Sequence, residues 1–249
     1  MAPKINLSII VLIAALLSAC SNGNSEQEHS KKDTQMIKAA SEVLHRALGE
    51  KSEAIQLEIL PAENGFDAYA YSCEEGQLKI KGTSVSALTR GTYDYLKDQG
   101  VGMVDWTGPH FRLPDQWPEA EAQKVVSPFK LRHAYNAVTS GYTTPYWDWE
   151  RWEKELDWQA MHGFNMLMVS AATEAIATRV WKKLGLTQTE IDDFYGGPAH
   201  MPWHRMGCVQ NLGGHLPPEW HEDQIALQHK ILDRMGKLGF CLLYTSPSP

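Results

Sequence analysis

Aromatic and amide side chains gather in two loops that follow apolar, strand-like segments. Asn136 and Tyr142 follow the predicted strand 129–135, and Trp203 lies in a second, longer loop. In folds that alternate strands and helices, ligands bind at the carboxyl ends of the strands. Aromatic rings there stack on flat ligands such as sugar rings, and an amide hydrogen-bonds to hydroxyl groups. The alternative is that the tryptophans of these loops, Trp147 among them, only hold the loops to the body of the protein.

One predicted helix carries four carboxylates: Glu150, Glu153, Glu155 and Asp157. Cleavage of a glycosidic bond needs two carboxylates about 5–10 Å apart on opposite sides of that bond. However, Glu150 and Lys154 are four residues apart, as are Arg151 and Glu155, which indicates a charged helix face in solvent. Glu174, just after the strand 164–169, is a minor candidate that would equally suit a helix N-terminus.

Ten histidines raise the question of a metal site. His200 and His204 have a spacing of four, but Pro202 between them argues against the regular helix that would bring both rings to one face. No cysteine or carboxylate joins them at ligand spacing, so no metal site is predicted. The sequence contains no phosphate-binding loop, dinucleotide glycine fingerprint or nucleophile elbow, and no cofactor is expected.

The elements that would position these residues form a second unit, 128–240. Strands are predicted at 129–135 and 164–169, with helices at 149–162, 173–184 and from 217 to 238, and the capping box Thr187–Glu190 opens a further helix. The almost wholly apolar run 164–169 is typical of a strand buried on both faces of a parallel sheet. This alternation predicts the first part of a (β/α)8 barrel, since a closed barrel takes about 250 residues by itself.

A smaller unit, 34–106, precedes it. A helix at 34–49, strands at 55–59, 68–73 and 77–81, a second helix from Thr83 or Ser84, and a strand at 101–104 predict a compact α/β domain. The proline-rich segment 107–127 is expected to connect the two units. The fold class is therefore α/β, a small α/β domain followed by a truncated barrel.

The two ends of the chain are expected to lie outside this fold. Residues 1–20 resemble a lipoprotein signal peptide, because an apolar run too short to span a bilayer ends in Leu17-Ser18-Ala19-Cys20. The resemblance predicts acylation of Cys20, a polar tether at 21–33 and membrane attachment at the bacterial cell envelope. An ordinary signal peptide with a chance cysteine is the alternative. The last stretch, 241–249, resembles a translated sequencing adapter and is expected to be a scar, with a natural Pro-Ser tail as the alternative.

Composition narrows the classes of partner. The chain of 249 residues carries a net charge of −7, from 23 basic and 30 acidic side chains. Nucleic-acid binding needs the opposite balance and is excluded as the main function. Cys73 and Cys208 fall in different units and are expected to be two separate buried thiols.

Several long runs in the second unit resemble the alpha-N-acetylglucosaminidases of glycoside hydrolase family 89. They are YWDWERWEKELDW (146–158), LGLTQTE (184–190), GPA (197–199), WHRMG (203–207), GHLPPEW (214–220) and LQHKILDRM (227–235). The likeness is weaker in the first unit. It implies an N-terminal α/β domain, a (β/α)8 catalytic barrel, a helical C-terminal domain, and removal of terminal α-linked N-acetylglucosamine with retention.

The resemblance also assigns roles to residues. Asn136, Tyr142 and Trp203 match positions that line the family's sugar pocket, although Val138 stands where the family can have cysteine. Both catalytic glutamates of the family fall after Phe240, so this chain is expected to contain no catalytic residue and to be inactive alone. The expected partners are a glycan with terminal α-N-acetylglucosamine and, through Cys20, a membrane. The alternative function is a surface lipoprotein that binds glycans without cleaving them.

Overall fold

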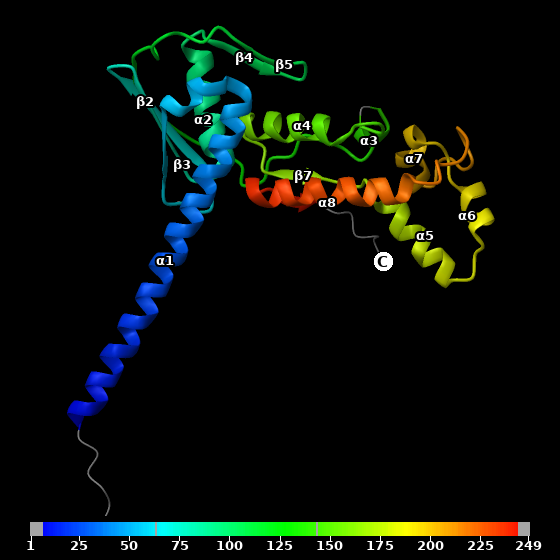
Figure 1. Ribbon diagram of the computed structural model, residues 1–249, viewed down its shortest axis with the longest axis horizontal. Helices are drawn as coiled ribbons and strands as arrows, with labels where there is room; N and C mark the ends of the chain where they lie inside the picture. Colours follow the sequence, from blue (N-terminus) through cyan, green and yellow to red (C-terminus); the bar gives the residue numbers. More distant parts are fainter. Residues whose placement is uncertain (1–6, 63, 143, 244–249) are drawn as a thin grey trace, which may run out of the picture.

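The computed structural model describes residues 7–62, 64–142 and 144–243, with side chains from residue 27 onward (Figure 1). Its first unit is a four-stranded sheet in the order β1-β3-β2-β6. The strands are β1 (Ile55–Ile59), β2 (Ala68–Glu74), β3 (Gln77–Gly82) and β6 (Ala120–Val126). β1 runs parallel to β3, and β2 runs antiparallel to both β3 and β6. Glu75 and Gly76, both with positive φ, make the two-residue turn between β2 and β3 that such hairpins favour.

The expected connector 107–127 is wrong. Residues of this segment form β5 (Gly108–Phe111), which pairs with β4 (Gly102–Asp105) in a separate hairpin, and β6, which completes the main sheet. β6 is an edge strand with mostly exposed side chains. It therefore lacks the apolar alternation by which a strand is found in a sequence, and the neighbouring prolines suggested a linker instead.

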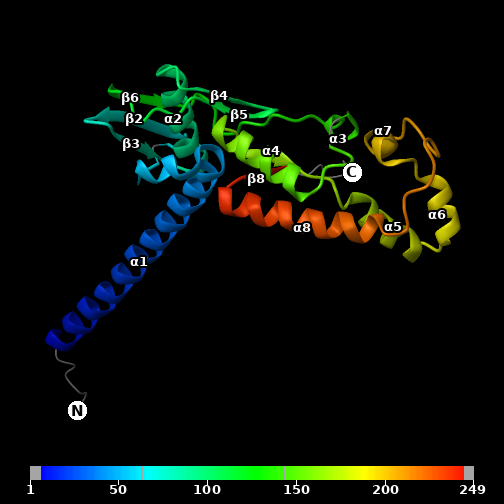
Figure 2. The same ribbon diagram turned by 45° about the horizontal axis from the view of Figure 1, so that its top comes forward.

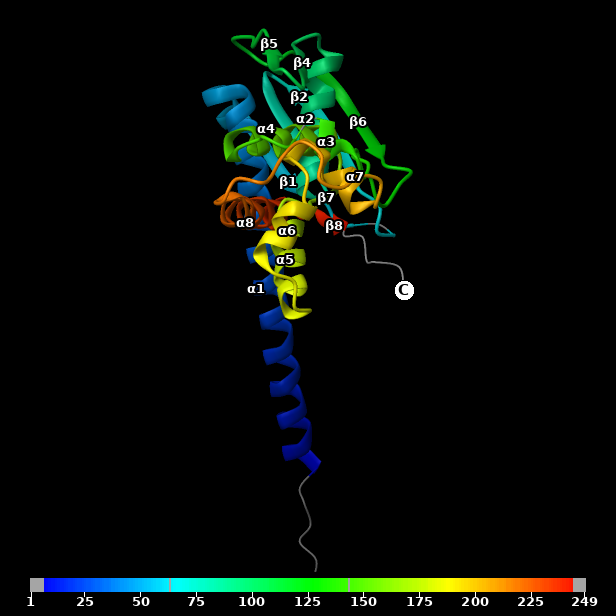
Figure 3. The same cartoon turned by 90° about the vertical axis from the view of Figure 1, so that its right-hand side faces the viewer.

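Two helices cover the first unit, α1 (Leu7–Leu48) and α2 (Val85–Asp98). α1 continues through 21–33, where a tether was expected, and it extends away from both units in Figure 3. The tether residues include Glu, Gln and Lys, which favour helix, and they continue a turn already held by the packed end of α1. Within the described residues no helix is long and apolar enough to cross a membrane. The side chain of Cys20 lies outside the described residues.

The second unit confirms the alternation of strands and helices. Its elements are α3 (Thr139–Tyr142), α4 (Trp149–Met161), β7 (Met166–Met168), α5 (Thr173–Lys183), α6 (Gln188–Phe194), the 3-10 helix Pro198–His200, α7 (Met201–Arg205), α8 (Trp220–Leu238) and β8 (Cys241–Leu243). β7 and β8 are parallel neighbours, and α4 and α8 run side by side over them (Figure 2). α5, α6 and α7 form an excursion between β7 and α8 at the end of the molecule far from α1 (Figure 1).

The first predicted barrel strand is reduced to a single bridge between His133 and Met166. Around it, Asn165 holds the segment by its side chain, accepting from Arg132 N and donating to Lys130 O. Phe129 and Leu131 are exposed, so the start of the segment buries no apolar face, whereas Tyr135 at its end packs against the core. The segment is extended and lies where the first barrel strand was expected, but it does not form the continuous row of backbone hydrogen bonds of a strand.

The expectation that 241–249 stands outside the fold is wrong for its first three residues. Cys241–Leu243 form β8, and Leu167 pairs with Leu242 in the register with β7. Cys241 N donates to Asn165 O at 2.8 Å, which continues the ladder. Residues 244–249 lie outside the described residues. The expected thiols are indeed unpaired, but only Cys73 is buried, because Cys208 sits in the exposed loop after α7.

The two units share one core. Side chains of α1, α2 and the sheet pack in a single apolar cluster with α4, β7 and α8. Hydrogen bonds cross the junction as well: Ser86 Oγ donates to Phe164 O at 2.7 Å, and Thr89 Oγ1 donates to Ala160 O at 2.8 Å. α2 is thus covered by its own sheet on one side and by α4 on the other.

A partly buried cluster of charges also joins the units. Asp157 on α4 accepts from Arg46 of α1, at 2.5 and 3.0 Å, and from Arg234 of α8, at 2.9 Å. Arg234 also donates to Glu42 at 3.1 Å, and Arg46 lies 4.0 Å from Glu153. With three carboxylates and two guanidinium groups, the cluster ties α1, α4 and α8 together. Two carboxylates of α4, Asp157 in this cluster and Glu155 outside it, are buried. This corrects the expectation that all the carboxylates of this helix face solvent.

Candidate functional site

Asn136 organises the loop at the end of the first barrel segment. Its Oδ1 accepts hydrogen bonds from the backbone N–H groups of Val138 and Thr139, each at 3.0 Å, and from Thr139 Oγ1 at 3.1 Å. These bonds close the turn that leads into α3. The predicted binding residue thus uses its carbonyl oxygen to shape the loop. Its amide NH2 makes no hydrogen bond within the described residues and remains available to a ligand.

Tyr142 and Trp203 meet across the two loops. Their rings pack edge to face with centroids 5.1 Å apart. Tyr142 ends α3 and is 75% exposed, while Trp203 lies on α7 and is half-buried. We call these two side chains the aromatic pair. A half-covered indole beside an exposed phenol offers apolar ring surface to solvent at the carboxyl end of the strands, where a ligand of this fold class binds.

Gly141 allows this contact. A Cβ at this position would lie 2.4 Å from the Trp203 ring and 2.9 Å from Ala199 O, closer than real contacts allow. Only glycine therefore lets α3 approach α7 at this distance. The two short helices depend on each other for their placement.

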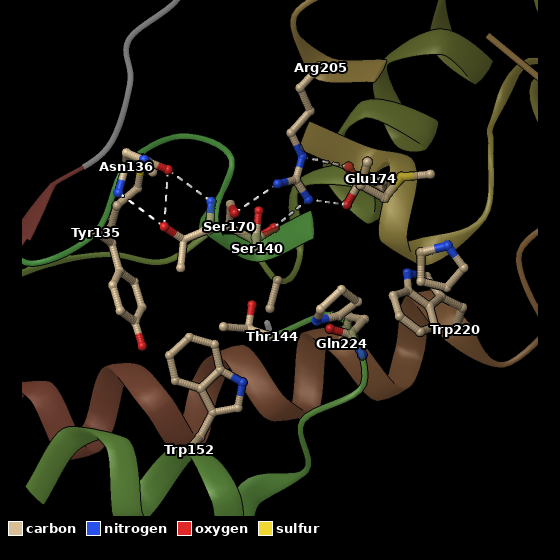
Figure 4. Close-up of a pocket in the computed structure, with 16 residues that line it drawn as sticks. Tyr135, Asn136, Ser140, Thr144, Trp152, Ser170, Glu174, Arg205, Trp220 and Gln224 are labelled. Atoms are coloured by element: carbon tan, nitrogen blue, oxygen red, sulfur yellow. Dashed lines mark hydrogen bonds and ion pairs between the residues drawn. The ribbon is translucent and has the colours of Figure 1, made fainter. Parts of the chain in front are cut away.

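A buried ion pair joins α5 to α7, the helix that carries Trp203, and Figure 4 shows its two side chains, Glu174 and Arg205. Glu174, at the start of α5, is 3% exposed and accepts two hydrogen bonds from Arg205, at 2.7 and 2.8 Å. Arg205 also donates to Ser170 Oγ at 2.8 Å and to Ser170 O at 3.0 Å. This fork geometry is the strong form of a carboxylate–guanidinium contact. Glu174 is therefore occupied by Arg205, which disfavours its minor candidacy as a catalytic carboxylate.

A small cavity extends from this ion pair toward α4 and α8. Its volume of about 40 Å³ leaves room for a few water molecules and not for a sugar ring. Asn136 lines it, but Tyr142 and Trp203 do not. Burial raises the pKa of the Tyr135 hydroxyl at its edge far above the ordinary value, and the charge of Glu155 adds to this.

Other predicted candidates have structural roles. Trp147 packs against Trp152 and under Arg151, whose guanidinium carbon lies 3.9 Å from its ring centroid. Trp147 thus holds its loop to α4. This agrees with the alternative stated above, that such tryptophans anchor loops. The expected pairs Lys154–Glu150, at 2.8 Å, and Arg151–Glu155, at 3.3 Å, are present on α4.

The histidines near Trp203 also serve the fold. α7 is helical although Pro202 lies within it, because a proline in the first turn of a helix removes no hydrogen bond. His204 bonds through Nε2 to Phe194 O at 3.2 Å, and burial lowers its pKa. Among the described residues, no group of three or more potential ligands lies close enough to hold a metal ion.

The sequence did not reveal Ser170 and Arg205 as parts of the site. Arg205 belongs to the motif 203–207 that carries the family resemblance, and Ser170 directly follows the strand 164–169. Position at a strand end was thus a usable signal for Ser170. Nothing in the spacing indicates that Arg205 pairs with a carboxylate 31 residues earlier.

Each of the two units matches a known protein family. Residues 38–119 match the family model described as alpha-N-acetylglucosaminidase N-terminal domain, and residues 132–245 match that of the alpha-N-acetylglucosaminidase tim-barrel domain. The second match runs past Phe240 through β8. The human alpha-N-acetylglucosaminidase is 38% identical over 182 residues, which are 72% of this chain and 24% of the human protein.

Solved structures agree. The family 89 glycoside hydrolase from Clostridium perfringens, in complex with PUGNAc, superposes with a TM-score of 0.81 and 27% identity, over 91% of this chain and 26% of that one. The same values hold for that hydrolase in complex with its substrate GlcNAc-alpha-1,4-galactose. The expected fold class, an α/β domain followed by part of a TIM barrel, is confirmed. This chain spans about a quarter of the length of these relatives. The chain belongs to the alpha-N-acetylglucosaminidases of glycoside hydrolase family 89.

Proposed function

We propose that this chain is the N-terminal part of a retaining glycosidase that removes terminal α-linked N-acetylglucosamine from glycans. The observation that carries the proposal is the aromatic pair, formed by the two residues that match sugar-pocket positions of the family, at the carboxyl ends of the strands. A relative of the same fold binds GlcNAc-alpha-1,4-galactose as its substrate. In this proposal Trp203 and Tyr142 receive the sugar, and Asn136 donates to it through its free amide.

The carboxylates that the structure describes near this site are engaged in the fold. Glu174 is held by Arg205, Glu155 by Arg151 and Gln159, and Asp157 by Arg46 and Arg234. Retaining hydrolysis needs a nucleophile and an acid/base about 5–5.5 Å apart. We therefore assign both roles to glutamates after Phe240, as the resemblance implies, and expect the 249-residue chain to be inactive.

Hydrolysis of an aryl α-N-acetylglucosaminide tests the proposal. A protein extended to the length of its relatives should release the aryl group, and proton NMR should show the α-anomer of N-acetylglucosamine first. The 249-residue chain, assayed in parallel, should release none. Initial appearance of the β-anomer would contradict retention, and no hydrolysis by the extended protein would contradict the function.

A binding module without catalysis is the second candidate. The exposure of the aromatic pair favours it, since stacking alone suffices to hold a glycan. Sequence after β8 distinguishes the two: two glutamates at the ends of later barrel strands mean an enzyme, and their absence means a binding protein. In either case we propose attachment to the bacterial cell envelope through an acylated Cys20, supported by the motif 17–20.

A further inference from the structure

The short helix that carries Trp203 is too small to hold its own position. α7 consists of five residues, Met201–Arg205, which make little more than one turn. A helix of this length has no independent stability in water, because forming the first turn costs more than its few hydrogen bonds return. The position of Trp203 must therefore be set by contacts that α7 makes with other elements.

Arg205 makes the strongest of these contacts. Four hydrogen bonds of 2.7 to 3.0 Å join its guanidinium group to Glu174 and Ser170. Glu174 belongs to α5 and Ser170 lies between β7 and α5, so Arg205 ties α7 to the carboxyl end of a barrel strand. Such a fork fixes the direction of the guanidinium group as well as its distance.

Weaker contacts add to the hold on α7. His204 bonds to Phe194 O at 3.2 Å, Met201 is buried in a small apolar cluster, and Trp203 rests on Gly141. None of them fixes the direction of α7 as the fork does. Loss of the fork would let α7 shift against α3 and would open the contact between Trp203 and Tyr142.

We propose that Glu174 and Arg205 are positioning residues, which hold the aromatic pair in the arrangement that receives the sugar. This inference rests on the proposed function. In this proposal Glu174, which is 3% exposed and bonded to Arg205, acts on the sugar only through the aromatic pair. A pair that stacks equally on substrate and transition state weakens both complexes alike when it is displaced, which raises KM and leaves kcat nearly unchanged.

The test is a double-mutant cycle in the protein extended to the length of its relatives. Glu174→Gln keeps the shape of the side chain and removes its charge, and it should raise KM about 10-fold with kcat within about 2-fold. In a Trp203→Ala background, the same substitution should leave KM unchanged, because the group through which it acts is gone. An equal rise of KM in both backgrounds, or none in either, would overturn the inference.

Matched controls separate positioning from folding. Glu190→Gln makes the same chemical change at the exposed capping box of α6 and should leave KM unchanged. Arg205→Lys keeps the charge but loses the fork, and it should reproduce the rise in KM. Arg205→Lys also replaces Glu174→Gln in the test if the latter variant does not fold.

A readout without activity keeps the two proposals distinct. Backbone amide hydrogen exchange at 206–208, whose N–H groups bond to 202–204, should accelerate on the order of 10-fold in Glu174→Gln and not in Glu190→Gln. An inactive wild-type protein whose Glu174→Gln variant shows this acceleration would overturn the proposed function and leave the anchoring of α7 established. Unchanged exchange would overturn the positioning role whatever the activity.

Discussion

Trp203 is the residue at which sugar binding and packing can be separated by experiment. In the extended protein, Trp203→Ala should lower kcat/KM about 10- to 100-fold, almost wholly through KM. The loss corresponds to about 1–3 kcal/mol, the scale of aromatic stacking on a flat ligand. Phenylalanine at the same position should restore part of the affinity, because it replaces part of the ring surface.

The melting temperature of the same preparations decides between the two roles of Trp203. If the indole only packs on Gly141, the alanine variant should melt earlier and recover normal kinetic constants at low temperature. Unchanged kinetics together with a lowered melting temperature would remove Trp203 from the site.

Cys20 gives the second prediction at this scale. Metabolic labelling with a fatty-acid probe should mark the wild-type protein in a bacterial host and should not mark Cys20→Ala. The reason is that the motif 17–20 places a single thiol where lipoprotein processing acts. Cys73→Ala, whose thiol is buried, is the matched control and should be labelled like the wild type. Equal labelling of Cys20→Ala would refute the anchor.

The residue types of the candidate site were predictable from the sequence, whereas the contacts between these residues were not. The family likeness indicated Tyr142 and Trp203, and the structure shows their rings in contact. It does not indicate that the Asn136 carbonyl closes a turn, since that depends on the backbone of Val138 and Thr139. Nor does it reveal the Glu174–Arg205 pair, because ion pairs between distant residues leave no periodic pattern in a sequence.

The junction of α1, α4 and α8 gives a prediction at the scale of elements. Its three carboxylates outnumber its two guanidinium groups, and Asp157 is the most buried of the three. Burial raises the pKa of Asp157 to about 7, against the opposing effect of Arg46. An unfolded chain would hold this pKa near 3.9.

The sign of the pH dependence follows from these two values. Between about pH 4 and pH 7 the folded protein keeps a proton on Asp157 that the unfolded chain has lost. The contribution of this group to the free energy of unfolding is therefore present at low pH and lost as the pH rises through 7.

Asp157→Asn, which imitates the protonated form, should abolish this dependence. From pH 5 to pH 8 the free energy of unfolding of the wild type should fall by on the order of 2 kcal/mol relative to that of the variant, measured by urea denaturation. Glu150→Gln, on the exposed face of the same helix, should run parallel to the wild type. A constant difference between wild type and Asp157→Asn across this range would contradict the raised pKa.

Elements with a strong local signal were predictable. Capping at Ser84 and Thr187, and apolar periodicity along α2, α4 and α8, are properties of neighbouring residues, and the structure confirms these helices. β6 and the segment 129–135 were not predicted correctly. The pairing of β6 depends on a partner some 50 residues earlier in the chain, and its side chains are mostly exposed. The local apolar pattern of 129–135 suggested a ladder that the fold does not complete.

At the scale of the whole molecule, the shared core makes the first unit depend on the second. α2 would lose its cover from α4 in an isolated fragment 27–127, which would expose this face of α2 and break the bonds of Ser86 to Phe164 O and of Thr89 to Ala160 O. We expect this fragment to be destabilised by about 3 kcal/mol relative to one extended through α4, residues 27–164.

Urea denaturation of the two fragments, followed by circular dichroism, measures this difference. A fragment 27–127 as stable as 27–164 would show that the sheet and its two helices are self-sufficient. The sequence suggested this independence, because the α/β layer of the first unit is complete in itself. The structure contradicts this independence, because a second face of α2, with Ser86 and Thr89, is covered by α4 of the other unit.

The bond between Arg234 and Glu42 joins residues 192 positions apart. At roughly 5–20 residues per second, a ribosome makes Glu42 on the order of 10–40 s before Arg234. During that interval the surface of α1 that faces α8 has no cover, although the sheet beside it can already form. Nascent chains of this protein therefore pass through a stage in which a charged and apolar helix face is open to chaperones and proteases, and the arrival of α8 ends it.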